Sequence, residues 1–328
     1  MATTGSVKSL TSRMPNINLH EEVDDLVAQV PEGMVTTYGQ VAIALGDIVA
    51  SRFVGKVMSE NDDMVRVPCR RVVQSDGSLG GYTGGGQREK KRALEKEGVR
   101  VERGKIVDFE KILFTDFKTT YPLRKFRRIQ IDDRKRLSLE DDFQADGDIA
   151  GSDVAYQGDE AFGALAVFSD GEMEPKEVVT VRAVVKFPYI PTYLTFREAP
   201  VVEKLIEKIG EKPVLVQDGN GTIHPMRFGI ASHIGVLFDL PTIGIAKKLL
   251  CGRVEGSGHI KRVDIDGELA GYAVSGPGWK APAYVSPGHR VSPRSVMRIL
   301  KPYWRHRIPE PVRAAHIEAG KKRSSVRH

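Results

Sequence analysis

The pattern of apolar and polar residues changes part-way along the chain, and this change predicts two domains. In the first part, apolar side chains in residues 20–30 recur with i, i+3, i+4, i+7 spacing, which predicts an amphipathic helix. Thr37 is placed to cap a second helix over residues 38–45, and a third is expected over residues 49–60. Two helices joined by a short turn that contains a glycine, here Gly46, are typical of the helix-turn-helix DNA-binding motif.

The rest of the first part combines a short apolar run, a glycine-rich loop and a charged helix. VPCRRVV (67–73) has the composition of a strand, GSLGGYTGGG (77–86) that of a loop, and QREKKRALEKEG (87–98) that of a helix. In the apolar run, Cys69 lies between a proline and two arginines. Such a cysteine is either a small buried apolar residue or a nucleophile whose thiolate the guanidinium groups stabilise.

The second part alternates short apolar runs with amphipathic segments, which indicates the strands and helices of a mixed α/β layer fold. Residues 178–187 alternate apolar and polar side chains, whereas residues 213–219 form a continuous apolar run that ends in an acid, as a buried strand does. Ser292 followed by Pro293 marks the start of a late helix. Further strands are expected over 163–168, 242–247, 267–274 and 281–287, and further helices over 196–210 and 228–238.

Length and composition favour a soluble globular protein of two domains. A chain of 328 residues exceeds the usual size of one core, although a single large α/β barrel is a competing interpretation. Two distant cysteines argue against a disulfide framework, and no apolar run approaches the roughly 20 residues of a spanning helix. Because the N-terminus also lacks a signal-peptide pattern, we expect a cytoplasmic protein without a membrane partner.

The charge of the chain is compatible with a polyanionic partner, since the net charge is +6 and the pI is near 9.1. Basic residues are concentrated in 124–136, which forms either a solvated helix face or linker, or a surface opposite a phosphate backbone. The domains expected from these patterns are a flexible N-terminus over 1–19, a first domain over 20–112, and a second over 113–328 with a basic lead-in over 121–136.

Three carboxylates and one imidazole of the second part stand at the ends of predicted elements. Asp153 lies in or just after an apolar strand, Glu198 starts a helix, Asp218 ends a strand, and His316 lies in a late helical segment. Each alone is most simply a helix cap or a surface residue. As a set, carboxylates from separate elements repel one another unless a divalent cation gathers them, and oxygen ligands favour Mg²⁺ or Mn²⁺. Such a site can assist an in-line phosphoryl displacement.

These residues lie in segments that resemble endonuclease V. The segments are FPYIPTYLTFRE (187–198), DGNGTIHPMRFGIASHIGV (218–236), PTIGIAKKLL (241–250), YVSPGHRVS (284–292) and RIPEPVRAAH (307–316). They occur in the order and at the spacing of that family and cover nearly all of the second part. The resemblance implies an RNase H-like fold that nicks DNA, or RNA in some members, containing deaminated bases, above all hypoxanthine. It further implies cleavage at the second phosphodiester bond 3′ to the lesion, which leaves a 3′-hydroxyl and a 5′-phosphate.

The resemblance also implies roles for individual residues. Asp153, Glu198, Asp218 and His316 match the metal site, Lys247 matches a lysine beside the scissile phosphate, and His224 matches a histidine near the active site and lesion pocket. A rigid apolar wedge that enters the duplex matches Pro188, Tyr189, Ile190 and Pro191, and the pocket for the flipped base matches Leu194, Gly219, Gly244 and Ala246.

Two positions depart from the family pattern. Thr192 stands where the family usually has a glycine after the wedge, and Asn220 stands where it usually has a glutamine. Either change can alter wedge flexibility or base preference, but neither falls on a metal ligand. For His289, in SPGHR, a structural role is favoured over a role as a ligand.

The first part resembles the DNA-binding and active-site half of O6-alkylguanine-DNA alkyltransferase. The matching segments are VPEGMVTTYGQVA (30–42), SRFVGKVMSEN (51–61), VPCRRVV (67–73), GSLGGYTGG (77–85) and LEKEG (94–98). The resemblance implies a winged helix-turn-helix-like domain in which Cys69 accepts an alkyl group once, without a cofactor. It further implies DNA contacts through Tyr38, Arg52 and Asn61, a loop closing over the lesion at Tyr82 and Thr83, and a proton relay that ends at Glu97.

Arg70 interrupts that pattern, because the family has a histidine that relays a proton from the cysteine toward the glutamate. Arginine cannot accept a proton at usable pH. Either Arg70 supports the Cys69 thiolate electrostatically and transfer persists, or the domain recognises alkylated DNA without repairing it.

The sequence as a whole predicts a bifunctional, monomeric DNA-repair protein with an alkyltransferase-like domain and an endonuclease V domain. Its predicted partner is damaged DNA, with inosine-containing RNA as an alternative, and its predicted cofactor is Mg²⁺, for which Mn²⁺ can substitute. One competing interpretation is a nuclease whose first domain only senses lesions, and another is a nucleic-acid-binding protein without catalysis in either domain.

Overall fold

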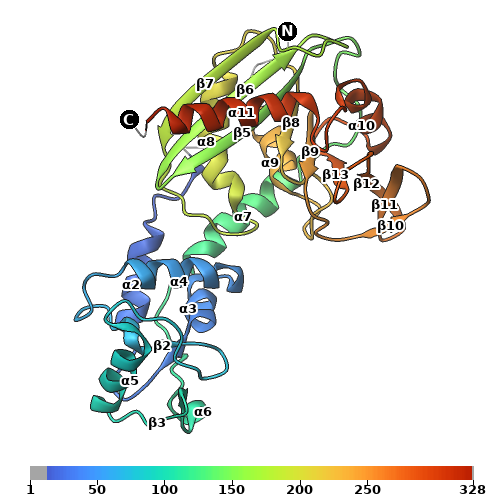
Figure 1. Ribbon diagram of the computed structural model, residues 1–328. Coiled ribbons are helices and arrows are strands. Elements are labelled where there is room, and N and C mark those ends of the chain that lie inside the picture. The colour runs from blue at the N-terminus through green and yellow to red at the C-terminus, as the bar shows by residue number, and fades with distance from the viewer. Residues whose placement is uncertain (1–12, 327–328) are drawn as a thin grey trace. The chain divides into compact units, whose positions relative to one another are not determined.

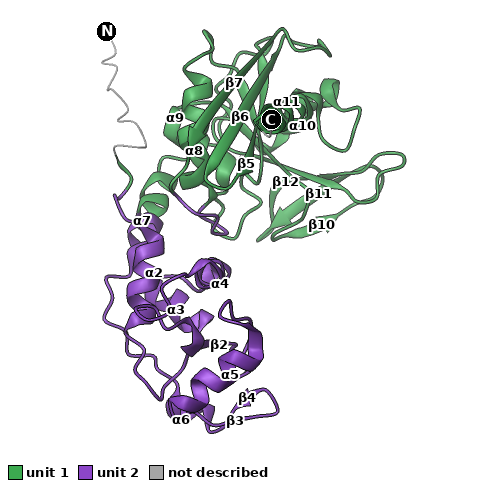
Figure 2. Ribbon diagram, turned by 60° about the vertical axis from the view of Figure 1, so that its left-hand side comes forward, with its two compact units in different colours: residues 1–14, 129–186, 194–328 green, residues 15–128, 187–193 purple. Residues whose placement is uncertain are grey.

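The computed structural model describes residues 13–326, which form two compact units (Figures 1 and 2). The helical unit comprises residues 15–128 and 187–193, and the sheet unit comprises the described residues of 1–14, 129–186 and 194–328. This arrangement confirms a two-domain fold and excludes a single barrel.

The helical unit extends further along the chain than the predicted division at 112. Residues after that point pack back onto it: Phe114 N donates to Val35 O at 2.7 Å, and Lys118 N donates to Gln29 Oε1 at 2.8 Å. Among the described residues of the predicted flexible N-terminus, Arg13 donates to Asp133 at 2.7 Å. Residues 1–12 lie outside the described part of the chain.

The helical unit contains the predicted helix-turn-helix in α3 (Tyr38–Leu45) and α4 (Ser51–Glu60). Thr37 caps α3 by accepting from Gln40 N at 3.0 Å, and Gly46 ends it with a φ of 119°, a left-handed conformation that favours glycine. The other elements are α2 (Leu19–Ala28), β1 (Thr36–Thr37), η1 (Ile48–Ala50), η2 (Cys69–Arg71), β2 (Val72–Val73), α5 (Gly86–Lys96), β3 (Val101–Glu102), β4 (Lys105–Ile106), α6 (Phe109–Ile112) and the start of α7 (Pro122–Arg134).

The sheet unit is built on a mixed sheet, for which the described residues give nine strands in the order β10-β11-β12-β13-β9-β8-β5-β6-β7. The central strand β8 is parallel to both β5 and β9, and the other pairs are antiparallel. The strands are β5 (Ile149–Gln157), β6 (Glu160–Phe168), β7 (Glu177–Val184), β8 (Val214–Asp218), β9 (Thr242–Ala246), β10 (Arg253–Glu255), β11 (Ile260–Ile265), β12 (Glu268–Val274) and β13 (Ala283–Pro287).

Helices cover both faces of this sheet. Helices α8 (Leu194–Ile206) and α9 (Ile230–Phe238) pack on one face, while α10 (Pro293–Leu300) and α11 (Glu310–Ser324) pack on the other (Figure 1). A short helix, η3 (Lys301–Tyr303), follows α10. The start of α11 lies against β5, because Gly151 has no side chain: a Cβ there would lie 2.0 Å from the carbonyl carbon of Pro311.

Most elements match the sequence predictions, including the Ser292 cap of α10. The apolar run VPCRRVV differs, because only Val72 and Val73 are strand while Cys69–Arg71 form a turn of 3₁₀-helix. The hairpin β10–β11 was not predicted, since its residues are mostly exposed and lack a clear apolar period. No described helix has the length and apolar character needed to cross a bilayer.

Candidate active sites

The four side chains predicted to bind metal come from four elements of the sheet unit. Asp153 lies on β5, Asp218 ends β8, Glu198 lies on α8 and His316 lies on α11. The parallel register pairs Ser152 with Gln217, so the next residues along, Asp153 and Asp218, emerge beside each other. The Nδ1 atom of His316 lies 2.7 Å from Oδ2 of Asp153. The fold therefore brings these side chains to one place.

Buried polar side chains orient Glu198. Ser152 Oγ donates to Gln217 Oε1 at 2.5 Å, and Gln217 Nε2 donates to Glu198 Oε2 at 3.2 Å. Both Ser152 and Gln217 are fully buried between β5 and β8. A buried amide that holds a carboxylate fixes its position before any ligand arrives.

Burial and the closeness of the carboxylates raise the pKa values of Glu198 and Asp153. Burial, together with the nearby carboxylates of Asp153 and Asp218, raises the pKa of Glu198 to about 8. Burial and the charge of Asp218 also raise the pKa of Asp153, although the His316 contact opposes this. Clustered carboxylates with raised pKa values are typical of functional sites that a cation or a proton neutralises.

The donor set fits a hard divalent cation in its chemistry, since it is dominated by carboxylate oxygens. Among residues 13–326, however, no group of three or more His, Cys, Asp or Glu side chains is already arranged to hold an ion. His316 instead contacts Asp153, and Lys247 Nζ donates to Asp218 Oδ2 at 2.9 Å. The charge and donor types therefore fit a metal, and small side-chain movements would have to open the site.

Lys247 and His224 lie on segments that flank the carboxylates. Lys247 directly follows β9, the parallel neighbour of β8, and its side chain is half-exposed. His224 is buried, and its Nδ1 accepts from Met226 N at 3.3 Å. His289 is structural, as predicted, because its buried ring accepts from Ser138 N at 3.1 Å.

The glycines predicted to line a base pocket are packed closely against neighbouring segments. A Cβ at Gly244 would lie 2.2 Å from Gly221 N, and one at Gly219 would lie 2.3 Å from Ile230 Cγ2. Gly219 N also donates to Ile245 O at 2.6 Å. Gly244 thus lets β9 approach the backbone that follows β8, and Gly219 leaves room for Ile230 of α9. The other two predicted pocket residues lie at element ends, Leu194 at the start of α8 and Ala246 at the end of β9.

The predicted wedge is only partly available to a ligand. Tyr189 is 62% exposed, whereas Ile190 is fully buried and Pro188 is also buried. Pro191 is partly exposed. One aromatic side chain therefore projects from a loop that its neighbours anchor.

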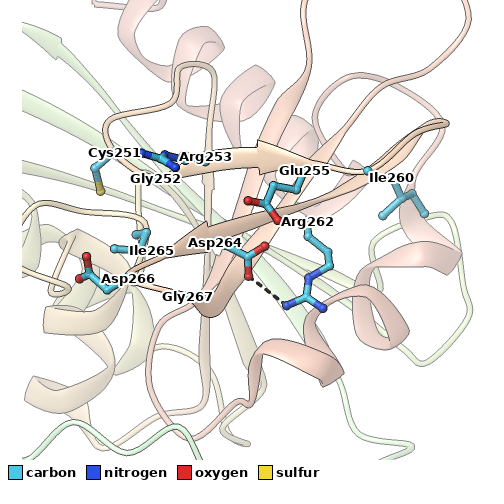
Figure 3. A pocket seen from close by; sticks show the side chains of 11 residues that line it. Cys251, Gly252, Arg253, Glu255, Ile260, Arg262, Asp264, Ile265, Asp266 and Gly267 are labelled. Carbon is cyan, nitrogen blue, oxygen red and sulfur yellow. Dashed lines mark hydrogen bonds and ion pairs between the residues drawn. The ribbon is translucent and has the colours of Figure 1, made fainter.

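A large cleft of about 1040 Å³ lies on the β10–β11 hairpin, lined by Cys251, Arg253 and Arg262 among others (Figure 3). One of its arginines, Arg262, forms an ion pair with Asp264 at 2.9 Å. None of the predicted site residues lines it.

The second candidate site surrounds Cys69 in the helical unit. Cys69 is buried and is a free thiol. Burial, and the charge of the Cys69 thiolate, raise the pKa values of Tyr38 and Tyr82, so both phenols lie near the sulfur. Tyr82 packs against Gly84, where a Cβ would lie 2.6 Å from the ring. The glycine-rich loop therefore packs on itself at Tyr82 and Gly84.

Glu97 is held by two arginines rather than by an imidazole. Arg70 donates through Nε to Glu97 Oε1 at 2.5 Å, and Arg71 donates through Nε to Oε2 at 2.8 Å. Arg70 also donates to Met64 O at 3.0 Å, and Arg71 to Val30 O at 2.7 Å. Burial opposes the ionised form, but these hydrogen bonds lower the pKa of Glu97. The carboxylate is thus fixed in its charged state.

Three of the predicted DNA-contact residues lie on the helix-turn-helix: Tyr38 begins α3, Arg52 lies on α4, and Asn61 follows α4. Asn61, at the end of α4, donates to Val67 O at 2.9 Å and so links that helix to the turn before Cys69. Arg52 and Thr83 are exposed, the former on α4.

Comparison with known proteins finds a matching family for each of the two units. A family model described as Endonuclease V matches residues 132–317, and one described as 6-O-methylguanine DNA methyltransferase, DNA binding domain, matches residues 18–99. A bifunctional methyltransferase/endonuclease of Picrophilus torridus is 34% identical and covers 92% of this chain and 96% of its own. The chain belongs to the endonuclease V family. It is a fusion of an endonuclease V domain with an alkyltransferase-type domain.

Two further relatives extend this identification. A bifunctional methyltransferase/endonuclease of Thermoplasma volcanium is 36% identical over 92% of this chain and 89% of its own. The crystal structure of Ciona intestinalis endonuclease V, in complex with DNA containing an inosine, has a TM-score of 0.58 and 28% identity, and covers 62% of this chain and 98% of that one. The predicted endonuclease V fold of the sheet unit is therefore confirmed.

Sequence reasoning missed one residue of the alkyltransferase-type domain, Lys90. Its side chain is fully buried and donates to Val72 O at 2.6 Å and Gly81 O at 3.1 Å. Burial lowers the pKa of Lys90 to about 8, while a negative charge on Cys69 opposes that shift. The signal in the sequence is the spacing of Lys90 from Leu94, which places a charge on the apolar face of α5.

Proposed function

We propose that this protein nicks DNA at deaminated bases with its sheet unit and takes alkyl groups from O6-alkylguanine onto Cys69 of its helical unit. The observation that carries the nuclease assignment is the cluster of Asp153, Asp218 and Glu198 within an endonuclease V fold, where burial and the neighbouring carboxylates raise the pKa values of Asp153 and Glu198. Damaged DNA is the proposed partner, and the inosine-containing DNA bound by the Ciona relative supports hypoxanthine as the lesion.

In the nuclease, Asp153, Glu198 and Asp218 would hold Mg²⁺ or Mn²⁺, with His316 beside them. When bound, the metal activates water and stabilises the charge that develops on the scissile phosphate. Ser152 and Gln217 hold Glu198 in place for this role. Lys247 is placed to offset charge on the phosphate, with cleavage at the second phosphodiester bond 3′ to the lesion.

Lesion recognition in the nuclease is assigned to the wedge and its neighbours. Tyr189, as the exposed member of Pro188–Pro191, replaces the stacking that is lost when a base is turned out of the duplex. The extruded base would then lie near Leu194, Gly219, Gly244, Ala246 and His224.

In the alkyltransferase, the Cys69 thiolate attacks the alkyl carbon of O6-alkylguanine. A carbon–sulfur bond forms, the carbon–O6 bond breaks, and its electron pair leaves with the guanine, which takes up one proton. Lys90 is the buried cation that is coupled to charge on Cys69. Tyr38, Arg52 and Asn61 bind the DNA, and Tyr82 and Thr83 close over the base, while Glu97 acts as an anchor for Arg70 and Arg71.

One test separates the two activities in the full-length protein. The chain is incubated with duplexes containing O6-methylguanine or inosine, and methylation of cysteine peptides and strand nicking are both measured. We expect one methyl group on Cys69, none on Cys251, and Mg²⁺-dependent nicking of the inosine strand. Cys69→Ser should lose methylation and keep nicking, and an unmodified Cys69 peptide at excess substrate would exclude the transferase.

A second candidate function for the helical unit is lesion sensing without repair. The specific observation in its favour is the double ion pair of Glu97 with Arg70 and Arg71, which leaves no imidazole to relay a proton. In that case the methylation test would leave Cys69 unmodified, and the unit would still bind O6-methylguanine DNA more tightly than undamaged DNA.

A further inference from the structure

The loop that carries Tyr189 is anchored in the helical unit. Residues 187–193, here called the wedge loop, group with that unit, although the chain on both sides belongs to the sheet unit. The aromatic ring of Phe187 packs edge-on against Phe126 of α7, with ring centroids 5.0 Å apart. The wedge loop is therefore held at its first residue by a helix that lies mostly before the residues matched by the endonuclease V family model.

The other end of the wedge loop is held by Arg127, the next residue of α7. Its guanidinium lies 4.2 Å from the centroid of the Tyr193 ring and donates through Nε to Tyr193 Oη at 3.1 Å. The same guanidinium donates to Thr192 Oγ1 at 2.9 Å and to Asp47 Oδ2 at 2.7 Å. Tyr193 Oη donates in turn to Asp47 Oδ2 at 2.9 Å.

Asp47 is the residue at the turn of the helix-turn-helix. Its side chain accepts from Val49 N at 3.2 Å and so caps η1, directly before α4. Although partial burial opposes ionisation, hydrogen bonds from Arg127 and from the backbone lower the pKa of Asp47, so the carboxylate is charged at neutral pH. Asp47, Arg127 and Tyr193, here called the clamp, are thus joined by a closed set of charge-assisted hydrogen bonds. These bonds connect the turn, α7 and the wedge loop.

Thr192 shows that this anchoring sets the shape of the wedge loop. Its φ is 67°, a left-handed conformation that is rare for a β-branched residue and costs of order 1 kcal/mol or more. Such a conformation persists only where surrounding contacts enforce it, and the hydrogen bond from Arg127 to Thr192 Oγ1 is one such contact.

We propose that Arg127, with Asp47 and Tyr193, is a positioning residue for lesion recognition by the nuclease: the clamp fixes the wedge loop to the turn of the helix-turn-helix and so presents Tyr189 for insertion into duplex DNA. This inference rests on the proposed nuclease function. The helix-turn-helix and the wedge loop then form one preorganised surface for binding duplex DNA. A planar guanidinium is required, because a lysine can neither stack on Tyr193 nor donate to three partners in the same fixed geometry.

The test compares two inosine substrates in the full-length protein under single turnover. In the first, inosine is paired within a duplex, so the wedge must open the helix. In the second, the same inosine lies in a mismatched bubble that is already open. The variants are Arg127→Lys, Asp47→Asn and Tyr193→Phe, and the control is Lys125→Ala, which removes a charge from the exposed face of α7.

We expect Arg127→Lys to slow nicking of the duplex by about tenfold or more and to change nicking of the bubble by less than about twofold. Asp47→Asn and Tyr193→Phe should act in the same direction, and each combined with Arg127→Lys should add little, because one network is already broken. Lys125→Ala should slow both substrates alike, or neither.

If Arg127→Lys slows nicking of the duplex and of the bubble equally, Arg127 has a general structural role. If Arg127→Lys nicks the duplex at the wild-type rate, Arg127 has no role in nicking. Either result overturns the proposal. Fluorescence of 2-aminopurine placed beside the inosine reports unstacking in the bound complex even without nicking. If the wild-type protein unstacks the probe but does not nick, the nuclease assignment fails. The clamp is then tested by whether Arg127→Lys loses the fluorescence increase, and a retained increase overturns it.

Discussion

The two candidate sites place a key glutamate in opposite electrostatic surroundings. In the sheet unit, Glu198 faces Asp153 and Asp218, and its pKa is raised to about 8 by burial and by their charge. In the helical unit, Glu97 accepts hydrogen bonds from Arg70 and Arg71, and its pKa is lowered although burial opposes this. One site holds excess negative charge, and the other is neutralised by the protein itself.

This difference indicates which partner each site requires. Carboxylates that repel one another gain free energy from a divalent cation, so this excess of negative charge is consistent with the metal proposed for the nuclease site. Glu97 is already paired with Arg70 and Arg71, so a further cation would give its carboxylate no added stabilisation. It therefore serves to hold the arginines beside Cys69, and any help in forming the thiolate has to come from elsewhere in the site, where Lys90 is the buried candidate.

The largest expected effect comes from removing one charge from the repelling cluster. Asp218→Asn should reduce nicking of inosine DNA on the order of a thousandfold, because it removes a proposed ligand of the metal, which would be worth several kcal/mol at the transition state. Methylation of Cys69 should be unchanged. Asp159→Asn, at an exposed turn of the same unit, is the control. Undiminished nicking by Asp218→Asn in the presence of a chelator would contradict the metal assignment.

A smaller effect is expected from Lys90→Met, which keeps the volume of the buried side chain but removes its charge. We expect methyl transfer to slow by about ten- to a hundredfold, since a positioned charge beside a nucleophile contributes on that scale. Nicking should not change. Lys91→Met on the same helix should leave both rates unchanged. If Lys90→Met transfers methyl at the wild-type rate, Lys90 is structural.

Arg70→His restores the imidazole of the alkyltransferase family and should change the pH dependence of transfer more than its rate. A histidine between Cys69 and Glu97 titrates near pH 6.5 and relays a proton only in its neutral form. Transfer by the variant should therefore slow by several-fold as the pH falls from 7.5 to 5.5, about one unit to each side of that value. The wild type has no imidazole at residue 70, so its transfer should lack this loss of rate. Parallel pH profiles would show that residue 70 has no part in proton transfer.

The smallest predicted effect concerns stability rather than activity. Asp133 of the sheet unit is buried beside Arg13 and His233, with its Oδ2 3.1 Å from His233 Nε2. Burial lowers the pKa of His233 in the folded state, although Asp133 opposes this, so the unfolded chain binds a proton first as the pH falls through about 6.5.

Acidification from pH 7 to 5.5 should therefore lower the free energy of unfolding of the sheet unit, by at most about 1.4 kcal/mol per pH unit for this one proton. Urea unfolding at several pH values measures this slope. His233→Gln should reduce the slope, and the exposed His259→Gln should leave it unchanged. A slope that His233→Gln does not alter would assign the acid sensitivity to other groups.

Much of the fold was predictable from local patterns. The Thr37 and Ser292 caps, the left-handed Gly46 and the continuous apolar run of β8 each depend on neighbours in the sequence, and the structure confirms them. The proposed metal-site residues were predicted from their types, their positions at element ends and the resemblance to endonuclease V, and that assignment stays a prediction. The exposed hairpin β10–β11 and the 3₁₀ turn at Cys69 were not predicted, since neither has an apolar period.

What the sequence determined by itself was most of the elements and the residue types able to do chemistry, because these follow from side-chain types and short-range spacing, while the resemblance of its motifs pointed to the two families. Only the tertiary structure decided how those residues are charged and held. Glu97 and Glu198 are the same amino acid, and their pKa values move in opposite directions because of neighbours distant in sequence. The clamp of Asp47, Arg127 and Tyr193 likewise joins segments up to 146 residues apart, a contact that no local pattern encodes.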